Sequence, residues 1–201
     1  MKIAVTGASG FVGRRLCARA RERGHEVVTI GRFSGDRRWD PMGGPAPLSG
    51  VDAVVHLAGE PVAEGRWTRR KMAAIRDSRV VGTRNLVEGL AGAPVRVLVS
   101  ASATGYYGDR GEEELTEDSP SGEGFLAEVC REWEREAFRA AERGVRVVVV
   151  RTGVVLGPDG GALARMRTPF WLGLGGRLGS GEQWMSWIDR DDLVGIYFHA
   201  L

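Results

Sequence analysis

The sequence predicts an α/β fold in which a doubly wound parallel sheet is covered by helices on both faces. Short apolar runs of strand length alternate with segments of helix length along most of the 201 residues. The runs are continuously apolar, which is typical of parallel strands buried on both faces. Glycine contributes 30 residues, well above its usual share of about 7%, so we expect many tight turns.

The first half of the chain alternates strands and helices. In chain order we expect a strand over 2–6, a helix over 11–23, a strand over 26–30, a strand over 52–57 and a helix over 68–90. Gly24 closes the first helix, and the stretch GAP at 92–94 ends the long one. The segment 31–51 is loop-like, with room for at most one short strand.

The second half continues this pattern and then loosens. We expect a strand over 95–100, a loop over 101–123, a helix over 124–143 closed by Gly144, and the most apolar strand over 145–150. A Gly-rich stretch follows, then a strand over 183–189 and a helix from Asp191 to Leu201. That helix lacks a Gly or Pro stop signal, so we expect the natural protein to be longer.

Composition and charge exclude several classes of function. The net charge of +2 gives no electrostatic case for nucleic-acid binding. Cys17 and Cys130 are far apart, and His25, His56 and His199 are scattered, so no metal site is expected. No apolar run reaches the ~20 residues of a membrane span, and the chain opens directly with a strand. We therefore expect a cytoplasmic protein with no membrane partner.

The stretch TGASGFVG follows the first strand and opens the first helix. In this context Gly7 permits a tight turn, Gly10 lets the backbone approach a pyrophosphate, and Gly13 lets the helix lie close to the sheet. The N–H groups at the helix start then hold the phosphates. The predicted cofactor-binding residues here are Gly7, Ser9, Gly10, Phe11, Val12 and Gly13.

The end of the second strand indicates which dinucleotide is bound. An Asp or Glu at that place grips the ribose of NAD(H), whereas an Arg suits the 2′-phosphate of NADP(H). The strand ends TIGR, which places Arg32 there, with Arg37 and Arg38 close behind. The sequence therefore favours NADP(H) over NAD(H). The alternative is that Arg32 is a solvated loop charge.

Seven stretches along the chain form a set of motifs. They are TGASGFVG (6–13), HLAG (56–59), VVGTRNLVEG (80–89), VSASATGYYGD (99–109), TEDSP (116–120), RTGVVLGP (151–158) and WIDRDDLV (187–194). In these motifs the chain resembles the extended short-chain dehydrogenase/reductase family, in its NAD(P)-dependent, epimerase-like branch of nucleotide-sugar epimerase-related proteins.

The resemblance implies a domain organisation and further site residues. A Rossmann-type NAD(P)-binding domain would occupy 1–151, and 152–201 would begin a small C-terminal substrate lobe. Leu57, Ala58 and Gly59 would pass beside the adenosine and the nicotinamide ribose. Family members often pair as homodimers through two long helices, which here are 68–90 and 124–143.

The resemblance also implies catalysis by Ser, Tyr and Lys together, and here the chain departs from the pattern. Ser102 takes the Ser position. Where the Tyr-x-x-x-Lys pair should stand, the chain has Phe125 or Leu126 and Val129 or Cys130. The usual catalytic pair is absent.

Two nearby tyrosines are the substitutes that the sequence offers. Tyr106 and Tyr107 lie a few residues beyond Ser102, and either can reach the same cleft as an acid/base. Aromatic packing or substrate stacking is the competing interpretation, and the turn-like GYYGD context favours it.

Three polar residues are candidates for substrate contacts: Arg79, Arg151 and Gln183. Arg79 stands where many family members have an Asn near the active site, so it either binds an anionic substrate group or is a surface charge. We expect His56 to be packed rather than catalytic. The acidic loop at 112–117 is expected to be solvated, and Trp171, Trp184 and Trp187 to form core and pocket wall.

Two classes of function remain open. The first is an NADP-dependent oxidoreductase or epimerase acting on a small hydroxyl- or carbonyl-bearing substrate, with a nucleotide sugar as one candidate. The second is a catalytically silent dinucleotide-binding sensor or scaffold. The retained SASATGYYG favours the enzyme, and the missing Tyr–Lys pair favours the sensor.

Overall fold

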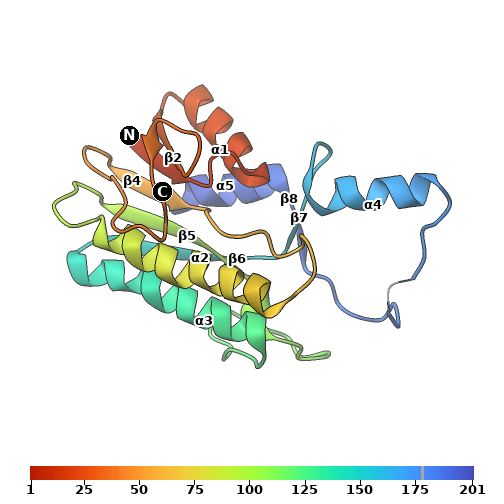
Figure 1. Ribbon diagram of the computed structural model, residues 1–201. Coiled ribbons are helices and arrows are strands. Elements are labelled where there is room, and N and C mark those ends of the chain that lie inside the picture. Colours follow the sequence, from red (N-terminus) through yellow and green to blue (C-terminus); the bar gives the residue numbers. More distant parts are fainter. Residues whose placement is uncertain (178) are drawn as a thin grey trace.

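A six-stranded parallel sheet runs through the centre of the molecule (Figure 1). The computed structural model describes residues 1–177 and 179–201. The strand order is β3-β2-β1-β4-β5-β6, in which every pair of neighbours is parallel. The strands are β1 (Lys2–Thr6), β2 (Glu26–Gly31), β3 (Arg37–Arg38), β4 (Ala53–His56), β5 (Val97–Ala103) and β6 (Arg146–Thr152). This is the order of a doubly wound dinucleotide-binding sheet, as predicted.

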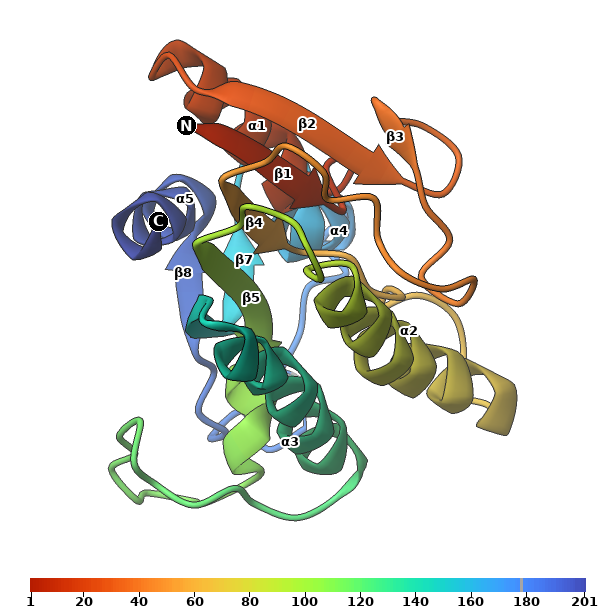
Figure 2. The same ribbon diagram turned by 90° about the vertical axis from the view of Figure 1, so that its left-hand side faces the viewer.

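Helices cover both faces of this sheet (Figures 1 and 2). On one face lie α1 (Phe11–Glu22) and α5 (Arg190–Ala200); on the other lie α2 (Arg69–Glu88) and α3 (Phe125–Phe138). Successive residues of a strand serve opposite faces: Ile3 and Val5 pack in the core with Tyr197, whereas Ala4 packs in the core of the other face. Because both faces of the sheet are covered by helices, successive residues of its central strands must all be apolar.

The direction of the chain reverses in the middle of the sheet, where β1 and β4 are neighbours. The chain winds from β1 out to β3, and then from β4 out to β6. Ligands of such sheets bind outside the carboxyl ends of the strands at this switch point. Thr6 ends β1 and His56 ends β4 at that place, and both side chains are fully buried.

A second, two-stranded sheet follows the large one and pairs β7 (Val154–Leu156) with β8 (Trp187–Asp189). Between them α4 (Gly161–Trp171) projects from the body of the molecule and has no buried residue (Figure 1). The chain then returns as α5, whose Leu193, Val194 and Tyr197 pack in the core of the large sheet. The α5 part of the range 152–201 thus packs against the large sheet as one of its covering helices.

Some elements differ from those the sequence predicts. The α-helix expected over 124–143 ends at Phe138 and continues as a 3-10 helix to Arg143. The strand expected over 183–189 covers only its last three residues. The sequence does not predict helix α4 or the three-residue strand β7. Helix α4 has no buried residue and contains Pro169, so it carries no amphipathic pattern.

The three tryptophans expected in the core are instead on the surface. Trp171, Trp184 and Trp187 are 79%, 77% and 62% exposed. They belong to α4, β8 and the segment between these two elements, which has few side chains to pack against.

In the described part of the chain, no helix is both long and apolar enough to cross a membrane.

Candidate functional site

The glycine turn between β1 and α1 is shaped by close approaches of the backbone. Gly7 has φ of +68°, which favours glycine, and a Cβ there would lie 2.8 Å from the carbonyl carbon of Leu57. A Cβ on Gly13 would overlap the carbonyl oxygen of Gly7. The turn and the first turn of α1 can therefore only be this compact with glycine at both positions.

Helix α1 begins without a side-chain cap. The N–H groups of its first turn, at Phe11, Val12 and Gly13, have no intrahelical partner, as at the start of any α-helix, and without a capping side chain they are suited to an anion. The side chains of these residues point elsewhere: the Phe11 ring packs against the turn that contains Gly157 and Gly160, and Val12 packs against the core. Phe11 and Val12 can thus serve a cofactor through their backbone only.

A cleft of about 510 Å³ lies over this turn, a size usual for small-molecule sites. Its walls come from the glycine turn, the end of β2, the segment after β3 and the loop after β4. The predicted residues among them are Gly7, Ser9, Gly10, Arg32, Leu57, Ala58 and Gly59. The structure thus brings together predicted residues from three separate segments of the chain: the glycine turn, the end of β2 and the loop after β4.

The three arginines after β2 have different surroundings. Arg32 is exposed and lines the cleft. Arg38 donates a hydrogen bond from Nη1 to the carbonyl of Arg32 at 3.1 Å, and Arg37 donates to the carbonyl of Pro47. Of the three, Arg32 is the one that lines the cleft, and its guanidinium lies 5.4 Å from the centroid of the Phe33 ring.

His56 supports the floor of the cleft. The Oγ1 atom of Thr6 accepts hydrogen bonds from the N–H groups of Leu57 and Ala58, so its own hydrogen goes to Nδ1 of His56 at 2.6 Å. Nε2 of His56 then donates to Thr83 at 3.0 Å. Burial, and then the charge of Arg79, lowers the pKa of His56 to about 4, so the ring is neutral. His56 is packed, as expected.

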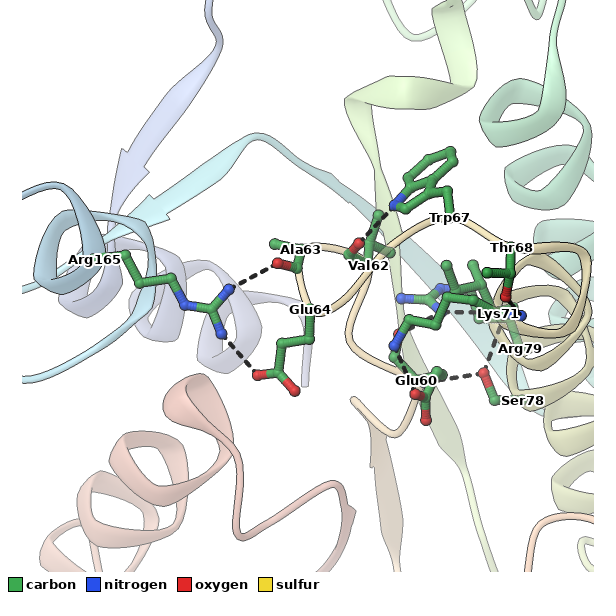
Figure 3. A network of polar contacts seen from close by, with 11 residues as sticks. Glu60, Val62, Ala63, Glu64, Trp67, Thr68, Lys71, Ser78, Arg79 and Arg165 are labelled. Atoms are coloured by element: carbon green, nitrogen blue, oxygen red, sulfur yellow. Dashed lines mark hydrogen bonds and ion pairs between the residues drawn. The ribbon is translucent and has the colours of Figure 1, made fainter.

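The loop that follows β4 is fixed to α2 by polar side chains (Figure 3). The Glu60 N–H donates to Oγ of Ser78 at 2.9 Å, and the Glu60 carbonyl accepts from Nη1 of Arg79 at 3.0 Å. Nζ of Lys71 lies 2.7 Å from Oε1 of Glu60. The wall of the cleft that contains Leu57–Gly59 is thereby held in place.

Arg79 is not a surface charge, which excludes one of the two interpretations of this residue. Its guanidinium lies against Gly59, donates to the Glu60 and Ile75 carbonyls, and stacks 5.2 Å from the Trp133 ring centroid. Burial lowers the pKa of Arg79 below its ordinary value. The Arg79 side chain nevertheless remains positively charged in its place between α2 and α3.

A second group of polar residues, the Ser102 cluster, lies on the neighbouring strands. It consists of Ser102 on β5, Tyr106 and Tyr107 just beyond β5, Glu134 on α3 and Arg151 on β6. Ser102 and Arg151 are direct partners in the pairing of β5 with β6. Oγ of Ser102 donates to Oε1 of Glu134 at 2.6 Å. With its hydrogen committed, Ser102 faces any further ligand as an acceptor.

The Glu134–Arg151 ion pair is bidentate. Nε and Nη2 of Arg151 donate to the two carboxylate oxygens at 2.9 and 2.8 Å. The Glu134 side chain is 6% exposed and that of Arg151 20%, so this pair is screened little by water. The hydrogen bond to Glu134 raises the pKa of Arg151 above its ordinary value. The predicted substrate residue Arg151 is thus occupied in holding the cluster together.

The two candidate tyrosines differ in their surroundings. Tyr107 is buried, and its hydroxyl accepts from Nη1 of Arg151 at 2.9 Å. Tyr106 is half-buried and its ring covers the Arg151 guanidinium at 3.6 Å. Within the described residues the Tyr106 hydroxyl has no hydrogen-bond partner. Tyr106 is therefore the tyrosine whose phenol is available to a substrate.

The positions of the missing Tyr and Lys are filled by apolar packing. Phe125 packs edge-to-face with Trp67 at 5.8 Å between ring centroids. Cys130 is buried beside Ser102, and burial, with the charge of Glu134 as a further cause, raises the pKa of its thiol. Cys130 is therefore a neutral side chain where the family pattern has a cation.

The remaining candidate, Gln183, is exposed in the segment before β8 and lies outside the cleft walls. Its role in substrate binding stays a prediction. The acidic loop is largely exposed, and Glu112 accepts a hydrogen bond from Trp184 at 2.9 Å.

Sequence reasoning missed Glu134 and Glu60. A signal for Glu134 existed, because it shares a helix face with Ala127, Cys130 and Ala137, all buried. A carboxylate within such an apolar stripe needs a partner.

The chain is similar to proteins of one known family. The sequence profile of the NAD dependent epimerase/dehydratase family matches residues 3–201. An epimerase family protein of Mycobacterium tuberculosis is 44% identical over 96% of this chain and 66% of its own length. The SDR39U1 homologue of Arabidopsis thaliana, described as chloroplastic, is 43% identical over the whole chain and 62% of its own length.

Two solved structures share the fold. Human SDR39U1 (isoform 2) with NADPH superposes with a TM-score of 0.90 at 38% identity, over all of this chain and 70% of the human one. A nucleoside-diphosphate sugar epimerase of Corynebacterium glutamicum superposes with a TM-score of 0.87 at 44% identity, over all of this chain and 43% of the other. The chain spans about two thirds of the length of most of the curated relatives that it matches.

Proposed function

Because the chain belongs to the NAD-dependent epimerase/dehydratase family, we propose that it binds NADP(H) and acts as an oxidoreductase or epimerase on a small substrate with a hydroxyl or carbonyl group. Among such substrates we favour a nucleotide sugar. The observation that carries the proposal is a juxtaposition at one edge of the sheet. The glycine turn after β1, Arg32 after β2 and Ser102 on β5 all lie at the carboxyl ends of parallel strands.

The cleft fits a dinucleotide in its chemistry. The uncapped first turn of α1 offers N–H groups to a pyrophosphate, and the compact Gly7–Gly13 turn leaves room for the backbone to approach it. Arg32 offers a guanidinium to a 2′-phosphate, which supports NADP(H) over NAD(H). The NADPH in the similar human structure supports the same choice.

The Ser102 cluster supplies the groups that would orient the substrate. A bound nicotinamide cofactor supplies hydride transfer. Ser102, whose hydrogen is donated to Glu134, would accept a hydrogen bond from the substrate hydroxyl. Tyr106 would exchange the proton, because its phenol is the available one and the Arg151 guanidinium lies against its ring.

Cofactor binding is tested first, by titrating NADPH and NADH into the wild type and Arg32→Glu while following nicotinamide fluorescence. We expect the wild type to bind NADPH at least tenfold more tightly than NADH, and Arg32→Glu to abolish that preference. Arg37→Glu is the matched control, since Arg37 binds the Pro47 carbonyl outside the cleft. Equal affinity for both cofactors in the wild type would refute the NADP(H) assignment.

A catalytically silent sensor or scaffold is the second candidate function. The specific observation in its favour is that Phe125 and Cys130 fill the usual catalytic positions with neutral, packed side chains.

Two assays together separate the two functions: oxidation of NADPH by a panel of carbonyl compounds, and interconversion of nucleotide sugars, in which an epimerase regenerates its cofactor. For an enzyme we expect Ser102→Ala and Tyr106→Phe each to lower kcat at least a hundredfold while NADPH affinity stays within twofold. Tyr197→Phe is the control, because Tyr197 of α5 is buried in the core on the other face of the sheet from Glu134 and Ser102. If Ser102→Ala and Tyr106→Phe together leave turnover unchanged, the catalytic assignment fails.

Two further proposals concern the setting of the protein. We infer a reducing, cytoplasmic compartment, because Cys17 and Cys130 are both buried free thiols. We also propose that α2 and α3, which lie side by side on one face, form a homodimer interface.

A further inference from the structure

Glu60 lies in the wall of the cleft, and both its backbone and its side chain are hydrogen-bonded to α2. It follows the Leu57–Gly59 stretch and lines the same cleft as Gly7 and Arg32. The Glu60 side chain is 29% exposed and that of its partner Lys71 is 16% exposed. The Glu60 side chain is thus partly covered by protein but still accessible from the cleft.

The support of Glu60 does not need the whole carboxylate. The loop is already fixed through the backbone of Glu60, by Ser78 at its N–H and Arg79 at its carbonyl (Figure 3). Lys71 contacts Oε1 alone, at 2.7 Å. Oε2 has no hydrogen-bond partner in the part of the chain that the structure describes. One carboxylate oxygen thus remains free to accept hydrogen bonds from a ligand.

We propose that Glu60 binds a ribose of the dinucleotide by accepting hydrogen bonds from its hydroxyl groups. This inference rests on the proposed function. A carboxylate is the group that dinucleotide-binding proteins use to recognise a ribose diol. Lys71 offsets the negative charge, so that Glu60 does not repel the pyrophosphate held in the same cleft.

The order of the strands assigns Glu60 to the nicotinamide half. The pyrophosphate position lies after β1, between β2 on one side and β4 on the other. Arg32, after β2, takes the adenosine half with its 2′-phosphate. Glu60, after β4, lies on the other side, toward Ser102 on β5. The ribose that Glu60 contacts is therefore the one that carries the nicotinamide.

The same loop contains a matched control. Glu64 is also paired with a cation, Arg165 on α4, at 2.8 Å (Figure 3). Its side chain is 56% exposed, and it does not belong to the cleft wall. Glu60→Gln and Glu64→Gln therefore remove the same charge from the same loop, on and off the cleft.

The experiment compares two ligands by isothermal titration calorimetry: NADPH, and adenosine 2′,5′-bisphosphate, which lacks the nicotinamide half. We expect Glu60→Gln to weaken NADPH about tenfold and to leave adenosine 2′,5′-bisphosphate within twofold of the wild type. Glu64→Gln should bind both ligands like the wild type. Thermal unfolding of each variant confirms that it is folded.

Each other outcome contradicts the proposal in a distinguishable way. If Glu60→Gln weakens both ligands equally, Glu60 acts on the adenosine half or on the shape of the loop. If it changes neither, Glu60 only ties the loop to α2. If the wild type binds neither ligand, the proposed function itself fails, and this inference fails with it.

Discussion

The dinucleotide cleft and the Ser102 cluster lie at the same edge of one sheet but are built in opposite ways. The cleft depends on atoms that are missing: glycines without a Cβ, and backbone N–H groups without a partner. The Ser102 cluster depends on charges that are present, because Glu134 and Arg151 are held by one another inside the protein. The first is shaped by steric limits and the second by electrostatic pairing.

The two regions tolerate different kinds of substitution. A cleft made from the backbone is insensitive to most side-chain changes but fails when a methyl group is added. A cluster made from a buried ion pair tolerates a change of size more readily than the loss of one charge. Three predictions test this contrast, in order of decreasing effect.

The largest effect is expected from Glu134→Leu. It leaves the Arg151 guanidinium without its carboxylate in a mostly buried place, which costs about 4 kcal/mol of unfolding free energy. Removing both charges in Glu134→Leu/Arg151→Met should restore most of that loss. Urea unfolding measures both variants. A double variant no more stable than the single one would show that the pair is not an electrostatic unit.

The next largest effect is the pH dependence of stability that arises from His56, the residue that supports the floor of the cleft. The unfolded chain binds a proton at His56 below about pH 6.5, whereas the folded chain does so only below about pH 4. Between these two pH values proton binding favours the unfolded state. The contribution of neutral His56 to the free energy of unfolding is therefore complete above about pH 6.5 and is lost as the pH falls toward 4. The loss is about 3 kcal/mol.

The measurement is the free energy of unfolding at pH 7 and pH 4 for the wild type and His56→Gln. All other titrating groups are shared, so the difference between the two pH dependences isolates His56. Parallel curves would contradict the neutral, buried state of the ring.

The smallest effect separates two glycines of the same turn. Gly13→Ala should cost about 2 kcal/mol of stability, because its Cβ overlaps the Gly7 carbonyl oxygen. Gly10 has φ of −73° and its Cβ would meet that oxygen at 3.1 Å, so Gly10→Ala should cost less than about 1 kcal/mol. Gly10→Ala should nevertheless weaken NADPH at least tenfold, since a methyl group then stands where the pyrophosphate approaches. Thermal unfolding measures the loss of stability in each variant, and NADPH titration measures the loss of cofactor affinity.

The large sheet could be predicted from the sequence because its signals are local. Apart from β3, each strand contains a short run of mostly apolar residues, and the glycine turn lies within eight consecutive residues. Ser102, Tyr106 and Tyr107 were named from one motif, and the structure places them together with Arg151. Their catalytic roles remain predictions.

What could not be predicted depends on contacts between distant elements. Glu60 owes its position to Lys71 on α2, which no local pattern specifies. The helix period places Glu134 on the buried face of α3, but its partner Arg151 lies on β6 and could not be identified from that pattern. Helix α4 buries no side chain, so its sequence carries no period to detect. The exposed tryptophans near it follow from the same lack of packing.

The ring of Phe11 restricts which sequences this fold can accept. A Cβ on Gly157 would lie 2.8 Å from its Cζ atom, and a Cβ on Gly160 would lie 2.7 Å from its Cδ2 atom. Gly160 has an extended backbone that any residue adopts, so the aromatic ring alone excludes larger side chains there. A larger residue at 160 requires either that the Phe11 ring moves or that residue 11 becomes smaller, so we expect these two sites to change together. The first residue of the phosphate-facing helix thus constrains a loop nearly 150 positions further along the chain.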